Sequence, residues 1–242
     1  MFVNESITKQ SRFLWFLTLF YVVVILLANW FDVRLIRIWH LVTDAGTIIF
    51  PLTFLLSDLI TEVYGYKNAR RAIWCGFLFN ALFIVYGQII THLPSPYYAS
   101  LNKSFDTLLT MNVRIIIAST ISYFCAEPLN SFIMSKLKIL MQGRKILVRF
   151  VASTVVASGV DSFIFGSLAF YNVMSNYHLL TLILTMWLIK VIIELLGLPI
   201  SIKLADKLKK LEMLDIYDWY TNYTLFSLNT QYTADNNSFK SS

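Results

Sequence analysis

The stretch FPLTFLLSDLITEVYGYKNARR, residues 50–71, contains the features that decide the class of this protein. Its first residues are almost all apolar, as in a helix buried in a lipid bilayer or in a helix bundle. Two carboxylates, Asp58 and Glu62, then follow one helical turn apart, so they share one face of the helix. A basic cluster at residues 67–71 comes next. The stretch therefore predicts a membrane-spanning helix that carries two acids near its end.

The composition indicates that the whole chain belongs in a membrane. Its 242 residues are 57% hydrophobic and only 14% charged, whereas soluble domains carry about a quarter charged residues. Six apolar runs are long enough for the roughly 20-residue helix that crosses a bilayer. We place them at residues 13–31, 42–61, 69–91, 112–135, 146–171 and 179–204. We therefore predict an all-α integral membrane protein with six transmembrane helices.

The six runs form one predicted domain, residues 1–218, followed by a polar cytoplasmic tail, residues 219–242, that we expect to be mobile. Lys and Arg define the orientation, because cytoplasmic loops of membrane proteins are enriched in them. Of the 20, 14 lie in the two termini, in the gaps at 62–71 and 136–145 and at the end of the sixth run (Lys203), while three lie in the other gaps. Both termini are therefore predicted to be cytoplasmic. The net charge of +6 follows from this topology, so nucleic acid is not an expected partner.

Charged side chains inside the apolar runs are the candidates for function. Each costs about 2.5–3.5 kcal/mol near a bilayer centre, so these residues must face one another, water or a ligand. The candidates are Asp58, Arg114, Glu127, Arg149, Asp161, Lys190 and Glu194. The rise of about 1.5 Å per helical residue places Glu127, Asp161 and Lys190 deepest. Arg114 and Arg149 lie near helix ends, where a long side chain can also reach water.

The deep charges allow a structural and a functional interpretation. Structurally, Lys190 pairs with Asp161 or with Glu194. Functionally, one deep carboxylate binds a ligand while another neutralises Lys190. We favour Glu127 as the ligand carboxylate, because the proline after it opens the helix backbone and Asn130 adds an amide on the same face. Asp161 is then the expected partner of Lys190.

The two acids of the opening stretch also allow two interpretations. Asp58 and Glu62 are either a solvated helix end or part of a gate on the cytoplasmic side. In both cases the expected partners are Lys67, Arg70 or Arg71, which follow within one to two helical turns.

Uncharged polar residues occur at similar depth. Asn80 lies in the middle of the third run. Thr154, Ser158, Ser162 and Gly166 repeat every four residues in the fifth run. Such a stripe of small residues lets another helix approach closely in a membrane. We interpret the stripe mainly as a packing surface.

Motifs for catalysis and metal binding are absent from the sequence. It contains no Walker A, H-E-x-x-H or G-x-S-x-G pattern. Cys75 and Cys125 have no metal-binding or disulfide spacing. His40, His92 and His178 lie near the ends of the runs, where interfacial solvation accounts for them. We predict no enzymatic activity, no metal and no cofactor.

Several segments resemble the queuosine precursor transporter family. FPLTFLLSDLITEVYGYKNARRA, residues 50–72, resembles the hallmark segment of that family. RIIIAST at 114–120, KILVRFVASTVVASGVDSFIFGSLAF at 145–170, KVIIELLGLPI at 190–200 and KKLEMLDIYD at 209–218 agree in the same order. The resemblance covers residues 15–218. It implies a six-helix protein of the cell inner membrane, similar in fold to the substrate-binding components of energy-coupling-factor vitamin transporters. It also implies import of cyano- or aminomethyl-deazaguanine, or of queuine.

The chemistry of a deazaguanine suits the deep residues. The base presents a ring N–H and an exocyclic amine along one edge, and a carboxylate can accept from both. Its carbonyl accepts from a lysine, an arginine or an Asn amide. The expected substrate-binding residues are Glu127, Asn130, Asp161, Lys190, Asn80, Glu194 and Arg149. The expected gating or pairing residues are Asp58, Glu62, Arg70, Arg71 and Arg114. Glu127 and Asn130 stand where some family members carry Gln and Asp, so the acid and the amide have exchanged places.

The nearest alternative function is the vitamin-binding component of an energy-coupling-factor ABC importer. Such components need a separate ATPase and typically carry an Ala-xxx-Ala motif in the first helix. The first run, FLWFLTLFYVVVILLANWF at residues 13–31, lacks this motif. The expected partners are therefore a small-molecule deazapurine and the lipid bilayer. No ATPase partner is expected, and the sequence allows a homo-oligomer.

Overall fold

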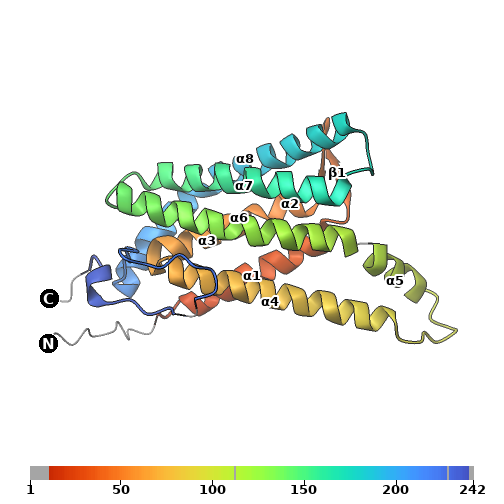
Figure 1. Ribbon diagram of the computed structural model, residues 1–242, viewed down its shortest axis with the longest axis horizontal. Coiled ribbons are helices and arrows are strands. Elements are labelled where there is room, and N and C mark those ends of the chain that lie inside the picture. The colour runs from red at the N-terminus through yellow and green to blue at the C-terminus, as the bar shows by residue number, and fades with distance from the viewer. Residues whose placement is uncertain (1–10, 112, 228, 240–242) are drawn as a thin grey trace.

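The computed structural model describes residues 11–111, 113–227 and 229–239. They form an elongated helix bundle (Figure 1). The helices are α1 Leu14–Phe31, α2 Gly46–Ile49, α3 Pro51–Tyr64, α4 Tyr66–Thr91, α5 Asn102–Met111, α6 Val113–Leu140, α7 Ile146–Phe170 and α8 Asn176–Glu212, with a 3-10 turn at Ala234–Asn236. An antiparallel hairpin of β1 Leu35–Ile38 and β2 Leu41–Asp44 lies at one end, which we call the hairpin end. The described chain begins and finishes at the opposite end, the termini end.

Five helical segments are long and apolar enough to cross a membrane: α1, the joined α2–α3 segment Gly46–Tyr64, α4, α7 and α8. The number rises to six if the bent pair Asn102–Leu109 and Arg114–Leu140 is one span. For the described part of the chain, this confirms the predicted all-α membrane fold. α8 continues to Glu212, past the predicted boundary at 204, because the added residues are mostly strong helix formers such as Ala, Leu, Lys and Glu.

α3 is the central helix of the bundle. Thirteen of its 14 residues are buried, and it contacts α1, α4, α6 and α8. In the most apolar stretch of the α2–α3 segment 83% of the residues are buried, whereas in that of α4 only 17% are buried, so α4 faces outward. Pro51 begins α3, where a helix needs no partner for its first N–H. This position of α3 places Asp58 and Glu62 inside the protein rather than at its lipid surface.

Gly65 makes the turn from α3 to α4. Its φ of 80° lies in the left-handed region that glycine adopts without strain. A Cβ atom at this position would lie 2.5 Å from the hydroxyl oxygen of Tyr232. The turn therefore needs glycine both for its backbone conformation and for the close approach of the C-terminal segment.

The β1–β2 hairpin was not predicted from the sequence. Its strands are four residues long, and so short a pattern does not separate a strand from a loop. Trp39 in the turn has a φ of 58° and is 89% exposed. The hairpin returns the chain to the end of α1, where the Ala45 amide donates to the Arg34 carbonyl at 2.8 Å. It thereby carries Asp44 back to α1.

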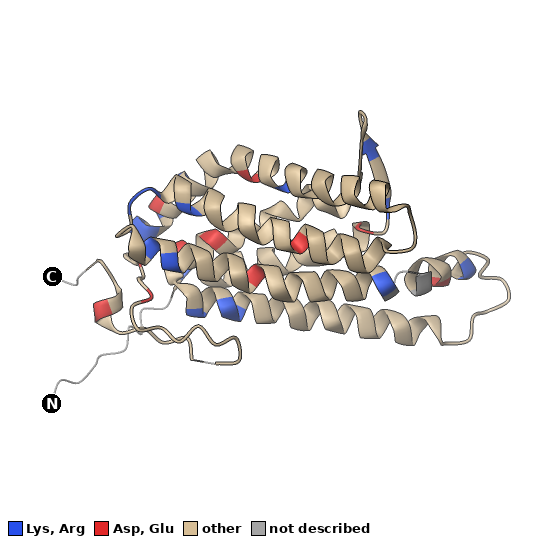
Figure 2. Cartoon of the chain, turned by 45° about the horizontal axis from the view of Figure 1, so that its top comes forward, with Lys and Arg blue, Asp and Glu red and all other residues tan. Residues whose placement is uncertain are grey.

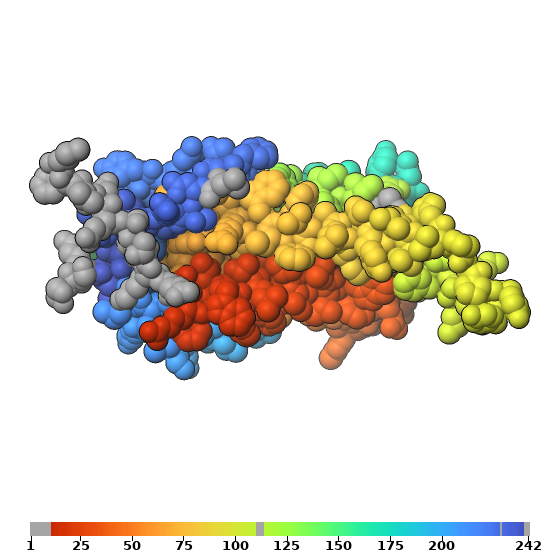
Figure 3. Space-filling model, turned by 90° about the horizontal axis from the view of Figure 1, so that it is seen from below, coloured from red at the N-terminus to blue at the C-terminus, as the bar shows by residue number. Residues whose placement is uncertain are grey.

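The described part of the C-terminal segment, residues 213–239, packs against the termini end of α4 and α6 (Figure 3). The carboxylate of Asp218 accepts hydrogen bonds from the Ser135 hydroxyl at 2.6 Å and from the Tyr232 hydroxyl at 2.5 Å. It also accepts from the backbone N–H that opens α4. These contacts hold the described part of the segment against the bundle, while the mobility that we expected of residues 219–242 stays a prediction.

Candidate substrate-binding site

Charged residues are unevenly distributed along the bundle (Figure 2). Lys and Arg gather toward the termini end, while several Asp and Glu lie within the helices. From the termini end to the hairpin end, we distinguish three groups among the buried charges. They are a network around Glu62, a cluster around Glu127 and Glu194, and an ion pair between Lys190 and Asp161.

Glu62 is the centre of the first group, which we call the termini network: Glu62, Lys138, Arg149, Lys209 and Asp215. Arg149 Nη1 and Nη2 donate to the two Glu62 oxygens at 2.5 and 3.0 Å, and Lys209 Nζ lies 2.5 Å from Glu62 Oε1. Lys138 Nζ lies 2.7 Å from Asp215 Oδ1. Although burial opposes its ionisation, Lys138 and Lys209 lower the pKa of Asp215. Because charge-assisted hydrogen bonds are strong and directional, the network ties α3 to α6, α7 and α8.

The predicted partners of Glu62 lie elsewhere. Arg70 donates to three backbone carbonyls of the C-terminal segment at 2.7–3.3 Å, and Lys67 Nζ donates to a fourth at 2.7 Å. Arg71 lines a surface cavity of about 220 Å³ between α4 and that segment. The turn at Gly65 is the physical reason, since it directs the start of α4 away from the acids of α3. The expected pairing of the acids with residues 67–71 is therefore corrected.

Arg149 and Arg114 are also held by protein groups. Arg149 belongs to the termini network and is fully buried, so it does not lie beside the deep charges. Arg114 donates from Nε and Nη2 to the carbonyls of Leu168 and Tyr171, both at 2.7 Å. These carbonyls belong to the last turn of α7 and the residue after it, where a cation is favourable. Arg114 thus caps a neighbouring helix.

Asp58 lies one turn deeper than Glu62 and has neutral partners. Its Oδ1 accepts from Asn130 Nδ2 at 2.7 Å, and its Oδ2 accepts from the Ser153 hydroxyl at 3.2 Å. Asp58 and Asn130 are both fully buried. With its amide nitrogen on Asp58, Asn130 leaves its carbonyl oxygen without a protein partner. Asp58 therefore orients Asn130 as a buried acceptor.

Lys190 and Asp161 form a buried ion pair between α8 and α7, as predicted. Lys190 Nζ also lies 4.7 Å from the centre of the Phe50 ring, which supplies a cation–π contact. The second oxygen of Asp161 has no protein partner. The pair thus keeps one acceptor available at the edge of the central cluster.

The central cluster consists of buried oxygens, on α6, α7 and α8, that lack a protein hydrogen-bond partner. They belong to Glu127, Asn130, Thr154, Ser158, Asp161, Ser162 and Glu194, and both oxygens of each glutamate are included. Buried polar groups in proteins are almost always hydrogen-bonded, and one left unpaired costs about 1–3 kcal/mol. Such a concentration of unpaired oxygens on three neighbouring helices makes this cluster the candidate site for a polar ligand.

The small-residue stripe of α7 contributes to this site as well as to packing. A Cβ on Gly166 would lie 2.4 Å from Ile183 of α8, so this end of the stripe is a close helix contact. Thr154, Ser158 and Ser162 are buried but keep unpartnered hydroxyl oxygens. The stripe therefore both brings α7 close to α8 and lines the central cluster with hydroxyl groups.

The central cluster is rich in hydrogen-bond acceptors. Glu127 and Glu194 supply four carboxylate oxygens without a cation partner among the described residues. A ligand that suits such a cluster carries several N–H donors or a positive charge. Lys190, at the edge of the cluster, supplies donors for a ligand acceptor.

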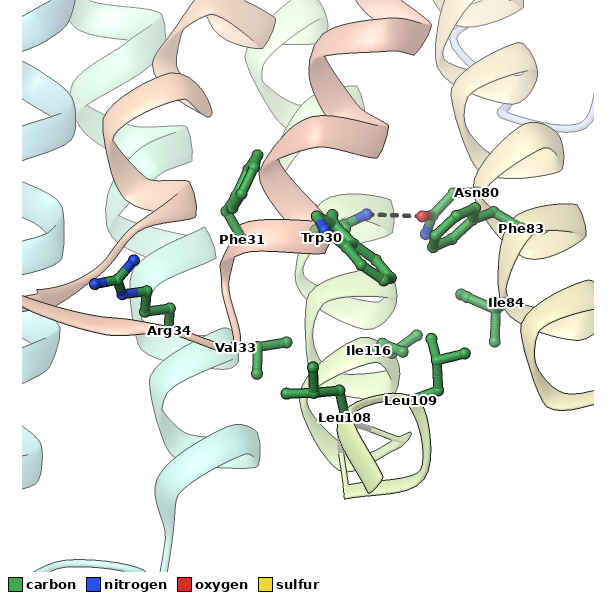
Figure 4. Close-up of a pocket in the computed structure, with 11 residues that line it drawn as sticks. Trp30, Phe31, Val33, Arg34, Asn80, Phe83, Ile84, Leu108, Leu109 and Ile116 are labelled. Atoms are coloured by element: carbon green, nitrogen blue, oxygen red, sulfur yellow. Dashed lines mark hydrogen bonds between the residues drawn. The ribbon is translucent and has the colours of Figure 1, made fainter. Parts of the chain in front are cut away.

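Asn80 lies on a different side of the bundle. Its side-chain oxygen accepts from Asn29 Nδ2 at 2.8 Å, as Figure 4 shows. The two amides line a groove of about 150 Å³, whose other walls include Trp30 and Phe83. Asn80 is therefore placed in an apolar groove between α1 and α4, and the structure does not bring it to the central cluster.

Sequence reasoning missed several residues near these groups. The hydroxyls of Tyr21, Thr53 and Ser57 face Glu127. Asp32 and Asp44 are buried beside Lys190, although the sequence placed Asp32 in the gap between the first two predicted spans and Asp44 near the start of the second. Only the hairpin brings them together, and no sequence signal pointed to it.

Metal binding finds no support in the described residues, which contain no group of three His, Cys, Asp or Glu placed to hold an ion.

Comparison with known proteins identifies the family. A protein-family model described as "Putative vitamin uptake transporter" matches residues 44–204. A "Probable queuosine precursor transporter" of Bacillus subtilis is 25% identical over 71% of this chain and 76% of its own length. The "Queuosine precursor transporter" of Escherichia coli is 29% identical over 69% of this chain and 73% of its own length. No solved structure matches, so the fold likeness to energy-coupling-factor components stays a prediction. The matched residues contain α3 and the whole central cluster, and this multi-pass membrane protein belongs to the family described as "Putative vitamin uptake transporter", a family of transporters and not of enzymes.

Proposed function

We propose that this protein imports a queuosine precursor, a cyano- or aminomethyl-deazaguanine or queuine, across the cell inner membrane, with both termini in the cytoplasm. The observation that carries the proposal is the central cluster of buried, unpartnered oxygens. The names of the relatives from Bacillus subtilis and Escherichia coli support the substrate class. The gathering of Lys and Arg toward the termini end supports the orientation.

Glu127 is the residue that we propose recognises the base through hydrogen bonds. Its two unpartnered oxygens can accept from the ring N–H and the exocyclic amine of a deazaguanine at once. The free carbonyl oxygen of Asn130 lies one turn further along the same helix and adds an acceptor. Lys190 can donate to the carbonyl of the base while it remains paired with Asp161.

Glu194 is the proposed binding partner of the aminomethyl substituent of the base. An aminomethyl group is a cation at neutral pH, whereas a cyano group is neutral. Glu194 is 1% exposed and has no cation partner among the described residues, so an ammonium group would neutralise it. We therefore infer a preference for the aminomethyl base over the cyano base.

The termini network is the proposed gate on the cytoplasmic side. It joins α3 to α6, α7 and α8 between the central cluster and the termini end, and its core pair of Glu62 and Arg149 is fully buried. Opening a path to the cytoplasm therefore requires these pairs to separate or to move together.

The proposal is tested in cells that cannot make queuosine precursors. Such cells receive the gene, are fed each base separately, and are assayed for queuosine in tRNA. Wild type should restore queuosine, and Glu127→Gln should fail with every base. Glu194→Gln should lose salvage of the aminomethyl base far more than of the cyano base. Asp206→Asn, on an exposed face of α8, is the matched control. No restoration by correctly inserted wild type would reject the function.

The alternative, a vitamin-binding component of an energy-coupling-factor importer, keeps one supporting observation, the description of the family model. Copurification of an ATPase pair with the protein, together with uptake that requires that pair, would favour this alternative over the stand-alone transporter.

A further inference from the structure

Two buried carboxyl groups at the hairpin end are not used by the proposed ligand site. Asp32 follows α1 and is 6% exposed, and Asp44 ends β2 and is 1% exposed. The hairpin brings the two carboxyl groups within hydrogen-bonding reach of each other. A Cβ on Gly46 would lie 1.8 Å from Asp32 Oδ1, so this close arrangement depends on a glycine. We call Asp32 and Asp44 the carboxyl pair.

The neighbours of the carboxyl pair are mostly neutral donors. The Thr47 amide and hydroxyl donate to the two oxygens of Asp44 at 2.6 and 2.7 Å. The Ser119 hydroxyl lies 3.4 Å from Asp32 Oδ2. Neither carboxyl group of the pair forms an ion pair with any of the described residues. The donors orient the carboxyl groups but do not neutralise them.

A small cavity connects the carboxyl pair to the ion pair. Its volume is about 10 Å³, room for about one water molecule, and its lining includes Asp32, Asp44, Asp161 and Lys190. Its remaining walls are Thr47, Phe50, Ser119, Ser122 and Phe165, which carry no charge. The buried Asp161 presents an unpartnered oxygen, while its other oxygen holds Lys190. Three carboxyl groups and one ammonium group therefore share this cavity.

The charges do not balance if all three carboxyl groups are ionised. Asp161 neutralises Lys190, which leaves two adjacent buried carboxylates without a cation. Repulsion and burial together oppose a second negative charge in such contact, so we expect one proton to remain on the pair. Burial and the neighbouring Asp44 raise the pKa of Asp32, in agreement with this argument.

We propose that Asp32 and Asp44 form a proton-binding site that couples transport to the proton gradient. The inference rests on the proposed transport function and adds the driving ion to it. The proton moves between water and a carboxyl oxygen of the pair, and no other bond forms or breaks. With the proton bound, Lys190 remains with Asp161 and can donate to the ligand carbonyl. Without it, the second negative charge draws Lys190 toward Asp32 and away from the ligand.

This linkage has a defined sign. Proton binding keeps Lys190 at the ligand site, so protonation and ligand binding favour each other, and by reciprocity each raises the affinity for the other. Ligand affinity should fall as the pH rises through the value at which the pair loses its proton. The carrier therefore moves proton and ligand in the same direction.

The first experiment detects the proton without any ligand. Infrared difference spectra of the purified full-length protein at neutral pH compare wild type with Asp32→Asn and with Asp44→Asn. Asp32→Asn should lose a protonated-carboxyl band, and Asp44→Asn should shift or remove the same band, because it removes the neighbouring negative charge while Asp32 stays buried. Bands from protonated carboxyl groups elsewhere in the protein cancel in the difference spectrum. The control Asp206→Asn should leave the protonated-carboxyl band unchanged. No band lost in either folded variant would overturn the proposal.

The second experiment tests coupling in proteoliposomes with labelled aminomethyl-deazaguanine and a clamped membrane potential. For one proton per ligand, an inward proton gradient of one pH unit should raise accumulation about tenfold. Asp32→Asn and Asp44→Asn should retain exchange of internal for external ligand but lose this accumulation. Stimulation by a sodium gradient alone, or full gradient-driven accumulation by both variants, would overturn the proton site. Absence of exchange in wild type would reject the transport function, and the infrared result would still decide the proton site.

Discussion

Replacing Glu62 by Gln should destabilise the protein strongly, because Glu62 is the only carboxylate that pairs with the buried Arg149 among the described residues. Lys209 keeps a second partner, since its Nζ lies 2.9 Å from Asp215 Oδ1. Arg149 would retain only the carbonyls of Arg144 and Gly143, both at 3.2 Å. The substitution therefore leaves a fully buried guanidinium without a counter-charge.

The magnitude follows from this burial. Removing one partner of a buried ion pair costs about 3–5 kcal/mol. For a chain of this size, about 2–4 °C of unfolding temperature corresponds to each kcal/mol, so the midpoint should fall by about 6–20 °C. The measurement is thermal unfolding of the purified protein in detergent, with Asp206→Asn as the control for loss of an exposed carboxylate.

A double variant makes the Glu62 prediction specific. Glu62→Gln combined with Arg149→Met removes both charges, so it should recover at least half of the lost unfolding temperature. An unfolding midpoint for Glu62→Gln equal to that of Asp206→Asn would refute the reasoning. It would mean that water or another carboxylate compensates Arg149.

Three further predictions concern other parts of the molecule. Asp161→Asn should lower the yield of folded protein, measured by size-exclusion chromatography, because Lys190 loses its only ion-pair partner among the described residues; a normal yield would show that another acid replaces it. Arg70→Ala should make the C-terminal segment more sensitive to proteolysis, because three backbone carbonyls lose their donor, and unchanged cleavage would contradict that role. In a cysteine-free background, Lys103→Cys should be labelled by an impermeant reagent from outside and Asp235→Cys only after permeabilisation; the reverse pattern would reject the orientation.

The sequence allowed correct predictions where few partners were available. Lys190 is the only deep cation, so its pairing with an acid on a neighbouring helix followed from the cost of burying it alone. Asp161 was the favoured acid, and the structure confirms the pair. The apolar runs likewise predicted the spanning helices, because length and hydrophobicity alone define a span.

The sequence failed where three-dimensional direction decides the partner. Residues 67–71 follow Glu62 closely in the sequence, yet the turn at Gly65 directs them toward the C-terminal segment. The true partners of Glu62 are Arg149 and Lys209, which are 87 and 147 residues away. Sequence spacing does not report how a helix is rotated or which distant helix it faces.

Short and irregular elements explain the remaining differences. The hairpin at residues 35–44 has strands too short for a periodic pattern, so the contact between Asp32 and Asp44 was not predictable. The C-terminal segment was expected to be mobile because its composition is polar and aromatic, and its mobility stays a prediction. Its packing depends on single contacts such as that of Tyr232 with Asp218, which only the folded chain reveals.

The central claim is that the buried oxygens between α6, α7 and α8 bind the donor edge of a deazaguanine through Glu127. The most direct measurement is equilibrium binding of labelled aminomethyl-deazaguanine to purified wild type and to Glu127→Gln. The variant keeps the shape of the side chain but replaces one acceptor oxygen with a donor. Binding should weaken by about 1.5–3 kcal/mol, roughly 10- to 150-fold, with the unfolding temperature preserved. Equal affinity of both folded proteins for the base would contradict the account.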